Sequence, residues 1–343
     1  MRVLLTGSNG YLGAVLGPML ALAGHDIVGL DIGYFADCHH GPPQAVATEP
    51  VDLRDLSASV CEGVDAIVHL GALSNDPLGN LDAELTHAIN TEATLRLARF
   101  ARAAGVARFV FSSSCSIYGA SGGEDLVDED APMHPVTPYA ESKVRVEEGL
   151  HELADDSFTP ISLRNATAYG WSPRLRLDLV LNDLVASALL TGEVRVLSDG
   201  TPWRPIVHAA DIAGAFCAAL DAPLAVVHDR AFNIGFTGEN YQVRDIAEIV
   251  AGVVEGSRVV ITGETGPDPR SYRVDFSRAA EAFPGWTQVW DARRGARDLV
   301  DRFTEFGLVA DDRRRFSRLA WLMALRDAGR LGPTLRWEGS GAG

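Results

Sequence analysis

VLLTGSNGYLG, residues 3–13, joins an aliphatic run to a glycine-rich turn and to the start of a helical pattern. Glycine at three positions of the turn allows a tight bend, a close approach of the backbone to a diphosphate, and close packing of the helix on the strand. The free N–H groups at the N-terminus of such a helix bind phosphate oxygens. We therefore predict a dinucleotide site at this turn, made by Gly7, Asn9, Gly10, Tyr11, Leu12 and Gly13.

A carboxylate follows this turn at a spacing typical of dinucleotide sites. Asp31 lies 18 residues after Gly13, at the end of the second predicted strand. A carboxylate there accepts hydrogen bonds from the ribose 2′-hydroxyl of NAD and repels the 2′-phosphate of NADP, so NAD is the predicted cofactor. Asp52, next to Leu53 after another predicted strand, contacts the adenine amino group or is a solvated turn residue. The sequence leaves both of these roles open.

Short aliphatic runs alternate with longer helical patterns through the first half of the chain. This alternation predicts parallel βαβ units with right-handed crossovers, and hence an α/β fold with a Rossmann-like doubly wound parallel sheet. We expect strands at 3–6, 26–30, 66–70, 109–112, 160–163 and 231–235, helices at 11–23, 85–104 and 142–153, and a strand running into a helix over 206–220.

After residue 165, loops rich in Pro, Gly and Trp interrupt shorter elements, which indicates a smaller C-terminal lobe interleaved with the first. We expect an NAD-binding domain over 1–165, to which 202–236 returns. The substrate-binding lobe is then formed by 166–201 and 237–330. The remaining residues, 331–343, are expected to be a tail that is disordered from Glu338 onward.

Composition argues against several classes of partner. The net charge of −16 repels polyanions, so neither a nucleic acid nor an anionic membrane is an expected partner. The longest apolar runs, such as 186–190, are far shorter than the roughly 20 residues that span a bilayer. No export signal follows Met1, so a cytoplasmic location is expected. Neither the four cysteines nor the Cys38-His39-His40 run has the spacing of a metal site, so no metal is expected.

A tyrosine–lysine pair is notable because Lys143 is the only lysine among 30 basic residues. Tyr139 and Lys143 are spaced i, i+4, which places them on the same face of a helix. An ammonium beside a phenol favours the phenolate, so we expect Lys143 to lower the pKa of Tyr139 toward that of a working general base. Ser114, at the end of a predicted strand, is expected to hydrogen-bond the same substrate oxygen.

Together these motifs resemble the extended short-chain dehydrogenase/reductase family of nucleotide-sugar epimerases and dehydratases. The likeness covers nearly the whole chain and adds the stretches HLGA at 69–72, WRPIVH at 203–208 and NIG at 233–235. It implies that Ser114, Tyr139 and Lys143 are catalytic and that NAD is the cofactor. With the resemblance, the expected cofactor-binding residues grow to include Asp31, Asp52, Leu53, Leu70, Gly71, Ala72, Asn90, Ser112, Tyr139 and Lys143.

The resemblance also implies that the substrate is a nucleotide-diphosphate sugar and that Arg204 grips its diphosphate. Thr167 stands where many members have Asn, and Pro205 stands where many have an acidic residue. A homodimer formed through 85–104 and 139–153 is implied by the family alone. The expected substrate-binding residues are Ser114, Cys115, Ser116, Thr167, Arg176, Asn182, Arg204, Asp268 and Arg270.

The two residues after the strand-end serine bear on the type of reaction. Family 4,6-dehydratases carry Asp-Glu there and family decarboxylases carry a Glu, whereas this chain has Cys115 and Ser116. Without those carboxylates we expect oxidation to a keto-sugar and return of the hydride to the opposite face, which is epimerisation, at C4. The alternatives left open are a nucleotide-sugar 4-ketoreductase, a dehydratase or decarboxylase, and a non-catalytic dinucleotide-binding protein.

The carboxylate of Asp31 gives a first testable prediction. We expect NAD to bind at least roughly tenfold more tightly than NADP, a difference of about 1.4 kcal/mol, because the 2′-phosphate meets a negative charge. Calorimetric titration with each dinucleotide measures the two affinities, and Asp31→Ala should reduce the difference between them. Equal or tighter binding of NADP would contradict the role of Asp31.

Overall fold

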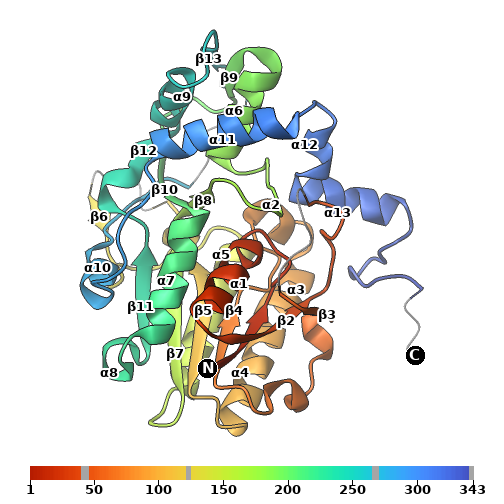
Figure 1. Cartoon of the computed structure of the whole chain (residues 1–343), viewed down its shortest axis with the longest axis vertical. Coiled ribbons are helices and arrows are strands. Elements are labelled where there is room, and N and C mark those ends of the chain that lie inside the picture. Colours follow the sequence, from red (N-terminus) through yellow and green to blue (C-terminus); the bar gives the residue numbers. More distant parts are fainter. Residues whose placement is uncertain (40–45, 121–124, 265–269, 340–343) are drawn as a thin grey trace.

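The computed structural model describes residues 1–39, 46–120, 125–264 and 270–339, and a seven-stranded parallel sheet forms its centre (Figure 1). The strand order is β11-β7-β5-β4-β1-β2-β3. Because β2 and β4 pair with opposite edges of β1, the chain winds outward in both directions, and the predicted doubly wound sheet is confirmed. The strands are β1 (Arg2–Thr6), β2 (Asp26–Asp31), β3 (Thr48–Pro50), β4 (Ala66–His69), β5 (Arg108–Ser114), β7 (Thr159–Asn165) and β11 (Arg230–Ile234).

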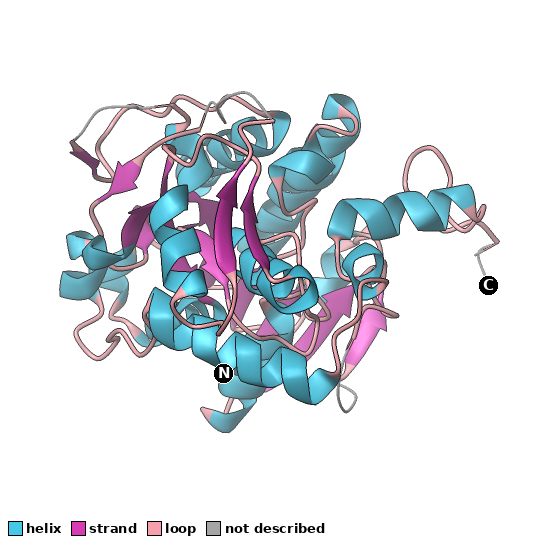
Figure 2. Ribbon diagram, turned by 90° about the horizontal axis from the view of Figure 1, so that it is seen from above, coloured by secondary structure: helices cyan, strands magenta, loops and turns pink. Residues whose placement is uncertain are grey.

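Helices cover both faces of this sheet, because successive apolar residues of its central strands point to opposite faces. On β1, Val3 and Leu5 belong to one apolar cluster and Leu4 belongs to another. The first cluster includes residues of α1 (Gly13–Leu22) and α7 (Ala209–Asp221), and the second includes residues of α4 (Ala93–Ala103) and α5 (Pro138–Leu153). Figure 2 shows the resulting layers of helices around the strands.

A smaller lobe lies over the carboxyl ends of the strands, at the top of Figure 1. Its three-stranded sheet has the order β12-β10-β8, and two further strand pairs, β9 with β13 and β6 with β14, complete its β-structure. The elements are β6 (Leu126–Val127), β8 (Thr167–Tyr169), β9 (Glu193–Val196), β10 (Trp203–His208), β12 (Asn240–Gln242), β13 (Arg258–Ile261), β14 (Arg273–Val274), α6 (Val180–Thr191), α9 (Val243–Ala251) and α11 (Ala292–Phe306).

The segment 202–236 is divided between the two lobes. β11 returns to the main sheet beside β7, and α7 packs against α1 on the face of that sheet. β10 instead pairs with β8 and β12 in the smaller lobe. The two lobes therefore exchange elements along the chain.

The helix expected over 85–104 is interrupted. A π-helical turn, His87–Glu92, separates α3 (Ala83–Thr86) from α4. Asn90 in this turn is buried and donates to the carbonyl oxygen of Leu73 at 3.2 Å, which ties the helix to the loop after β4. π-Turns of this kind often occur near functional sites. The other short helices are α2 (Asp76–Gly79), α8 (Leu224–Val227), α10 (Ser277–Ala282), α12 (Asp312–Arg315) and α13 (Arg318–Asp327).

The segment expected to be a tail is folded through residue 339. Leu331 and Leu335 are 4% and 1% exposed, and Trp337 donates from its indole N–H to the carbonyl oxygen of Ile32 at 2.8 Å. These apolar side chains attach the segment to the N-terminal domain, so Glu338 belongs to the ordered fold. Residues 340–343 lie outside the described residues.

Candidate active site

A cavity of about 940 Å³ runs between the carboxyl ends of the sheet strands and the smaller lobe. Its walls include the glycine-rich turn and the ends of β2 and β5 on one side, and residues of α6, β10 and α13 on the other. Ligands of doubly wound proteins bind at this edge of the sheet, where the direction of winding reverses. This cavity is therefore the candidate active site.

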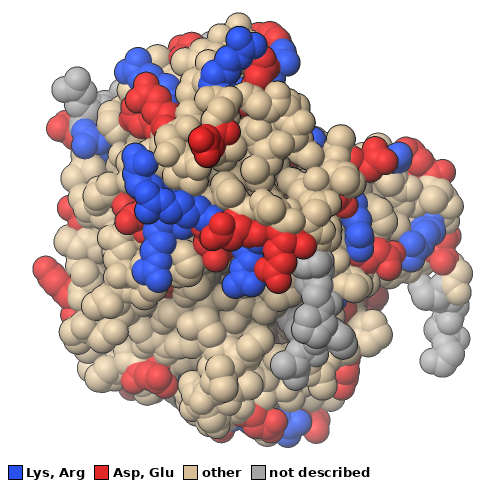
Figure 3. All heavy atoms as spheres, turned by 45° about the horizontal axis from the view of Figure 1, so that its top comes forward, with Lys and Arg blue, Asp and Glu red and all other residues tan. Residues whose placement is uncertain are grey.

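Basic side chains outnumber acidic ones in the lining of this cavity. On the outer face seen in Figure 3, basic side chains lie next to acidic ones. The cavity walls likewise include five aspartates, some of them paired with arginines, but more basic residues: Lys143, Arg176, Arg195, Arg204, Arg270, Arg313, Arg314 and Arg318. A small anionic ligand can therefore be held locally even though the chain carries a net charge of −16.

The glycine-rich turn forms the part of the cavity next to β1 and α1. Gly7 has a φ of +68°, which favours glycine, and a Cβ there would lie 2.9 Å from the backbone nitrogen of Gly71. A Cβ on Gly13 would lie 2.2 Å from the carbonyl oxygen of Gly7. Residues 10–13 all line the cavity at the start of α1. The turn thus has the shape and the backbone donors that the diphosphate of a dinucleotide needs.

At the end of β2, the carboxylate of Asp31 is fixed by two backbone N–H groups. Gly33 donates to it at 2.7 Å and Asn9 at 3.1 Å. Burial raises the pKa of Asp31, and these two hydrogen bonds act in the opposite direction. Asn9 therefore contributes through its backbone, and Asp31 is held beside the turn, where the ribose of a dinucleotide belongs.

Of the remaining predicted cofactor residues, all but Asn90 line the cavity. Asn90 lies behind the cavity wall, where its side-chain oxygen accepts the backbone N–H of Leu73 at 2.8 Å. The carboxylate of Asp52 reaches the cavity but is paired with Arg54 at 2.5 Å, so it is not a freely solvated turn residue. The others, Leu53, Leu70, Gly71, Ala72 and Ser112, line the cavity.

The three predicted catalytic side chains come together from β5 and α5. Thr137 caps α5 by accepting a backbone N–H with its hydroxyl, which places Tyr139 in the first turn and Lys143 one turn later. The ammonium of Lys143 donates to the carbonyl oxygen of Ser112 at 2.7 Å and lies 5.5 Å from the ring centroid of Tyr139. The side chain of Ser114 is close enough to that of Tyr139 to affect its pKa. All three side chains line the cavity.

The acidity of these groups differs from the sequence-based expectation. Burial, together with the charge of Asp76, raises the pKa of Tyr139 to about 12, while the neighbouring side chain of Ser114 acts in the opposite direction. Burial lowers the pKa of Lys143 to about 7, with Glu147 acting in the opposite direction. The expected net lowering of the Tyr139 pKa by Lys143 is therefore not found in the protein alone, because the removal of water dominates at both groups.

Glu147 supports α5, the helix that carries Tyr139 and Lys143, and was not predicted. Its carboxylate accepts a hydrogen bond from Arg164 at 2.7 Å and another from the hydroxyl of Ser113. The Glu147 and Arg164 side chains are 9% and 6% exposed, so this is a buried ion pair. The available signal was its position one helical turn after Lys143, on the same face of α5.

Arg204, predicted to bind the diphosphate, and Arg176, predicted to bind the substrate, both line the cavity. Arg204 donates to the carbonyl oxygen of Trp203 at 2.7 Å and to that of Arg270. Arg176 pairs with Asp178 at 2.9 Å. Thr167 and Ser116 also line the cavity, whereas Asp268 lies outside the described residues.

Asp76, the first residue of α2, is a carboxylate in this cavity that sequence reasoning missed. It is 8% exposed, accepts a hydrogen bond from Thr137 at 2.6 Å, and pairs with Arg270. Its charge acts on Tyr139, which places it at the catalytic end of the cavity. The signal was an acidic residue in the loop after β4, because loops at the carboxyl ends of parallel strands form the site.

Two predicted substrate residues lie behind the wall instead of in it. Cys115 is fully buried, and its thiol points to the carbonyl oxygen of Arg164 at 3.1 Å. Asn182 is also fully buried and donates to the carbonyl oxygens of Gly170 at 3.1 Å and Arg176 at 2.9 Å. Both side chains therefore hold the backbone that carries the cavity lining.

Within the described ranges, no group of three or more His, Cys, Asp or Glu side chains is placed to hold a metal ion. No helix in those ranges has the length and apolar character needed to cross a membrane.

Comparison with known proteins identifies the family of the chain. The model of the NAD dependent epimerase/dehydratase family matches residues 3–235. A UDP-glucose 4-epimerase of Mycolicibacterium smegmatis is 31% identical over 320 residues, covering 88% of this chain and 98% of that protein. A UDP-glucose 4-epimerase of Corynebacterium glutamicum is 28% identical over 309 residues, covering 84% of this chain and 91% of that protein.

Solved structures show the same relationship. MoeE5 in complex with UDP-glucuronic acid and NAD aligns with a TM-score of 0.75 and 26% identity, over 90% of this chain and 100% of that one. TunA, an NDP-hexosamine 5,6-dehydratase, shares the fold with a TM-score of 0.78 at 22% identity, over 89% of this chain and 98% of that one. The family uses NAD, and the glycine-rich turn is shaped to take it. The chain belongs to the NAD-dependent epimerase/dehydratase family.

Proposed function

We propose that the protein is an NAD-dependent epimerase of a nucleoside-diphosphate sugar, acting at C4 through a transient 4-keto sugar. The proposal is carried by one observation, that Ser114, Tyr139 and Lys143 line the same cavity as the dinucleotide turn and a group of arginines. One cavity then holds a cofactor, a sugar hydroxyl and a diphosphate together. The name of the 31% identical relative, UDP-glucose 4-epimerase, supports uridine diphosphate as the carrier of the sugar.

In the proposed reaction, Arg204 and Arg270 bind the diphosphate and hold the sugar against Tyr139. Tyr139 accepts the proton of the sugar 4-hydroxyl, and Ser114 holds the same oxygen by a hydrogen bond. When bound, NAD supplies the hydride acceptor, and its positive charge favours ionisation of a nearby phenol. Lys143 is fixed behind Tyr139 and, in its protonated form, stabilises the same phenolate.

Epimerisation needs no acid or base beyond these groups, because Tyr139 gives back the proton that it took. The keto-sugar turns about its diphosphate bonds and receives the hydride on the opposite face. The positions that carry carboxylates in family dehydratases are Cys115, which is turned toward a backbone carbonyl, and Ser116, which offers a hydroxyl. These two residues favour epimerisation over 4,6-dehydration.

A dehydratase is a second candidate because Asp76 places a carboxylate at the catalytic end of the cavity. This carboxylate is held by Thr137 and Arg270. A diphosphate that takes Arg270 leaves Asp76 free to remove a proton from carbon, which is the step that water loss requires. The product distinguishes the two candidates, since a dehydratase releases a sugar nucleotide lighter by one water.

The homodimer and the cytoplasmic location stay predictions. α4 and α5, which the family resemblance assigns to the dimer interface, pack against each other on one face of the main sheet. Light scattering of the purified protein should give the mass of two chains. A monomeric mass at micromolar concentration would contradict the dimer.

The fate of the hydride tests the reaction. If hydride leaves and returns within one cavity, a UDP-hexose deuterated at C4 should keep its label in the epimer, and free NADH should not accumulate. NMR of the product and absorbance of the cofactor measure these outcomes. Stoichiometric oxidation of added NADH with a keto-sugar would instead identify a ketoreductase, and loss of one water would identify a dehydratase.

The role of Tyr139 is tested by Tyr139→Phe, which removes the proton acceptor and leaves the ring in place. We expect turnover to fall by roughly 10²-fold or more while NAD stays bound. Tyr241→Phe is a matched control, because Tyr241 lies on β12 and does not line the cavity. Near-normal turnover of Tyr139→Phe would refute the catalytic assignment.

A further inference from the structure

The chain ends in a folded segment, residues 331–339, that we call the C-terminal strap. It follows α13, which lines the cavity through Arg318 and Ala320. The strap closes on itself through an antiparallel bridge between Leu331 and Trp337 and a hydrogen bond of 2.8 Å from the N–H of Gly332 to the carbonyl oxygen of Arg336. In Figure 1 it lies beside β2 and β3, far in sequence from both strands.

Apolar contacts attach the strap to the walls of the cavity. Leu331 and Leu335 belong to one apolar cluster with Tyr34, Leu73 and Ile89. The last three residues come from the loops after β2 and β4 and from the π-helical turn, and all three also line the cavity. Movement of the strap would therefore disturb packing directly behind the cavity wall.

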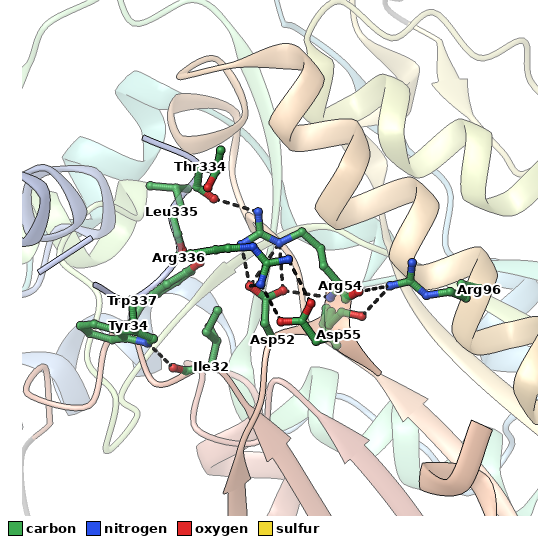
Figure 4. A network of polar contacts seen from close by, with 11 residues as sticks. Ile32, Tyr34, Asp52, Arg54, Asp55, Arg96, Thr334, Leu335, Arg336 and Trp337 are labelled. Carbon is green, nitrogen blue, oxygen red and sulfur yellow. Dashed lines mark hydrogen bonds and ion pairs between the residues drawn. The ribbon is translucent and has the colours of Figure 1, made fainter. Parts of the chain in front are cut away.

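Polar contacts join the strap to the loop that follows Asp31. The indole N–H of Trp337 donates to the carbonyl oxygen of Ile32 at 2.8 Å, and the hydroxyl of Tyr34 donates to the carbonyl oxygen of Leu335 (Figure 4). Asp31, the predicted ribose-binding carboxylate, directly precedes Ile32. The strap thus fixes the backbone on which that carboxylate is carried.

A second set of contacts joins the strap to the loop that follows β3. Arg336 lies 2.6 Å from Asp55 and 3.7 Å from Asp52, and Arg54 donates to the carbonyl oxygen of Thr334 at 2.8 Å. Arg54 also pairs with Asp52, whose side chain is 11% exposed and lines the cavity. Figure 4 shows the guanidinium groups of Arg54 and Arg336 next to each other, in contact with the carboxylates of Asp52 and Asp55. Removal of Arg336 would take from Asp55 its ion pair at 2.6 Å.

We propose that the C-terminal strap is part of the cofactor site, where it fixes the two loops that receive the adenosine half of NAD and slows the release of the cofactor. Arg336 and Trp337 are positioning residues, because they act through Asp52 and Ile32. If these loops are already ordered before NAD binds, the entropic cost of binding is smaller. By linkage, NAD bound between these loops must in turn stabilise the strap.

The test compares Arg336→Ala and Trp337→Ala with Arg258→Ala, a matched loss of an arginine that pairs with Glu193 on the surface of the smaller lobe. Calorimetry measures the Kd values of NAD, ADP-ribose and UDP, and a chase with unlabelled NAD measures its release from the loaded protein. In both strap variants we expect NAD and ADP-ribose to bind about tenfold more weakly, because each variant loses a charge-assisted or buried hydrogen bond. We also expect NAD to dissociate faster. UDP should bind within about twofold of the unaltered protein, and Arg258→Ala should change none of these values.

Hydrogen exchange is measured on the unaltered protein, so its result does not depend on how well a variant folds. Saturating NAD should slow amide exchange in 331–339, and UDP should leave that exchange unchanged. The proposal is overturned if NAD leaves exchange in the strap unaffected. It is also overturned if both strap variants keep the NAD affinity and release rate of the unaltered protein, or if they lose NAD and UDP binding to the same extent, which would assign the strap to the general stability of the fold.

Discussion

The buried ammonium of Lys143 is the constraint around which the catalytic end of the molecule is arranged. A charge that is 4% exposed is costly unless fixed polar groups replace its water. The carbonyl oxygen of Ser112 accepts its hydrogen bond, and Glu147 on the next turn supplies the opposite charge. Glu147 is itself buried and is balanced by Arg164. These contacts fix α5 against the ends of β5 and β7, and so they set where Tyr139 meets Ser114.

This arrangement explains how much of the site follows from the sequence. The glycine turn, Asp31 and the Tyr139–Lys143 spacing depend on local geometry, since a turn, a strand end and one helix face determine them. The acidity of Tyr139 does not, because it reflects burial by segments far along the chain. Local patterns likewise gave no sign that Cys115 and Asn182 turn away from the cavity, because the direction of a side chain depends on what packs around it.

Long-range contacts also account for the features of the fold that were not predicted from the sequence. Asp76 becomes part of the site because α2 packs against α5. The packing is so close that a Cβ added at Gly79 would lie 2.8 Å from the Cβ of Tyr139. The end of the chain was expected to be a tail because chain termini are often disordered, yet Leu331, Leu335 and Trp337 pack against residues near the start of the chain. Its order comes from these contacts, since nothing in its own composition predicts a helix or a strand.

The pairing of Asp76 with Arg270 connects substrate binding with the chemistry at Tyr139. Each of these two charges neutralises the other, which limits the free-energy cost of holding them away from water. A diphosphate carries more negative charge than one carboxylate and offers more acceptor oxygens, so it competes well for Arg270. The released carboxylate then faces Tyr139, whose pKa its charge already raises. In the proposed reaction, the positive charge brought in with the cofactor opposes that effect, so it is the cofactor, and not the substrate, that favours the phenolate.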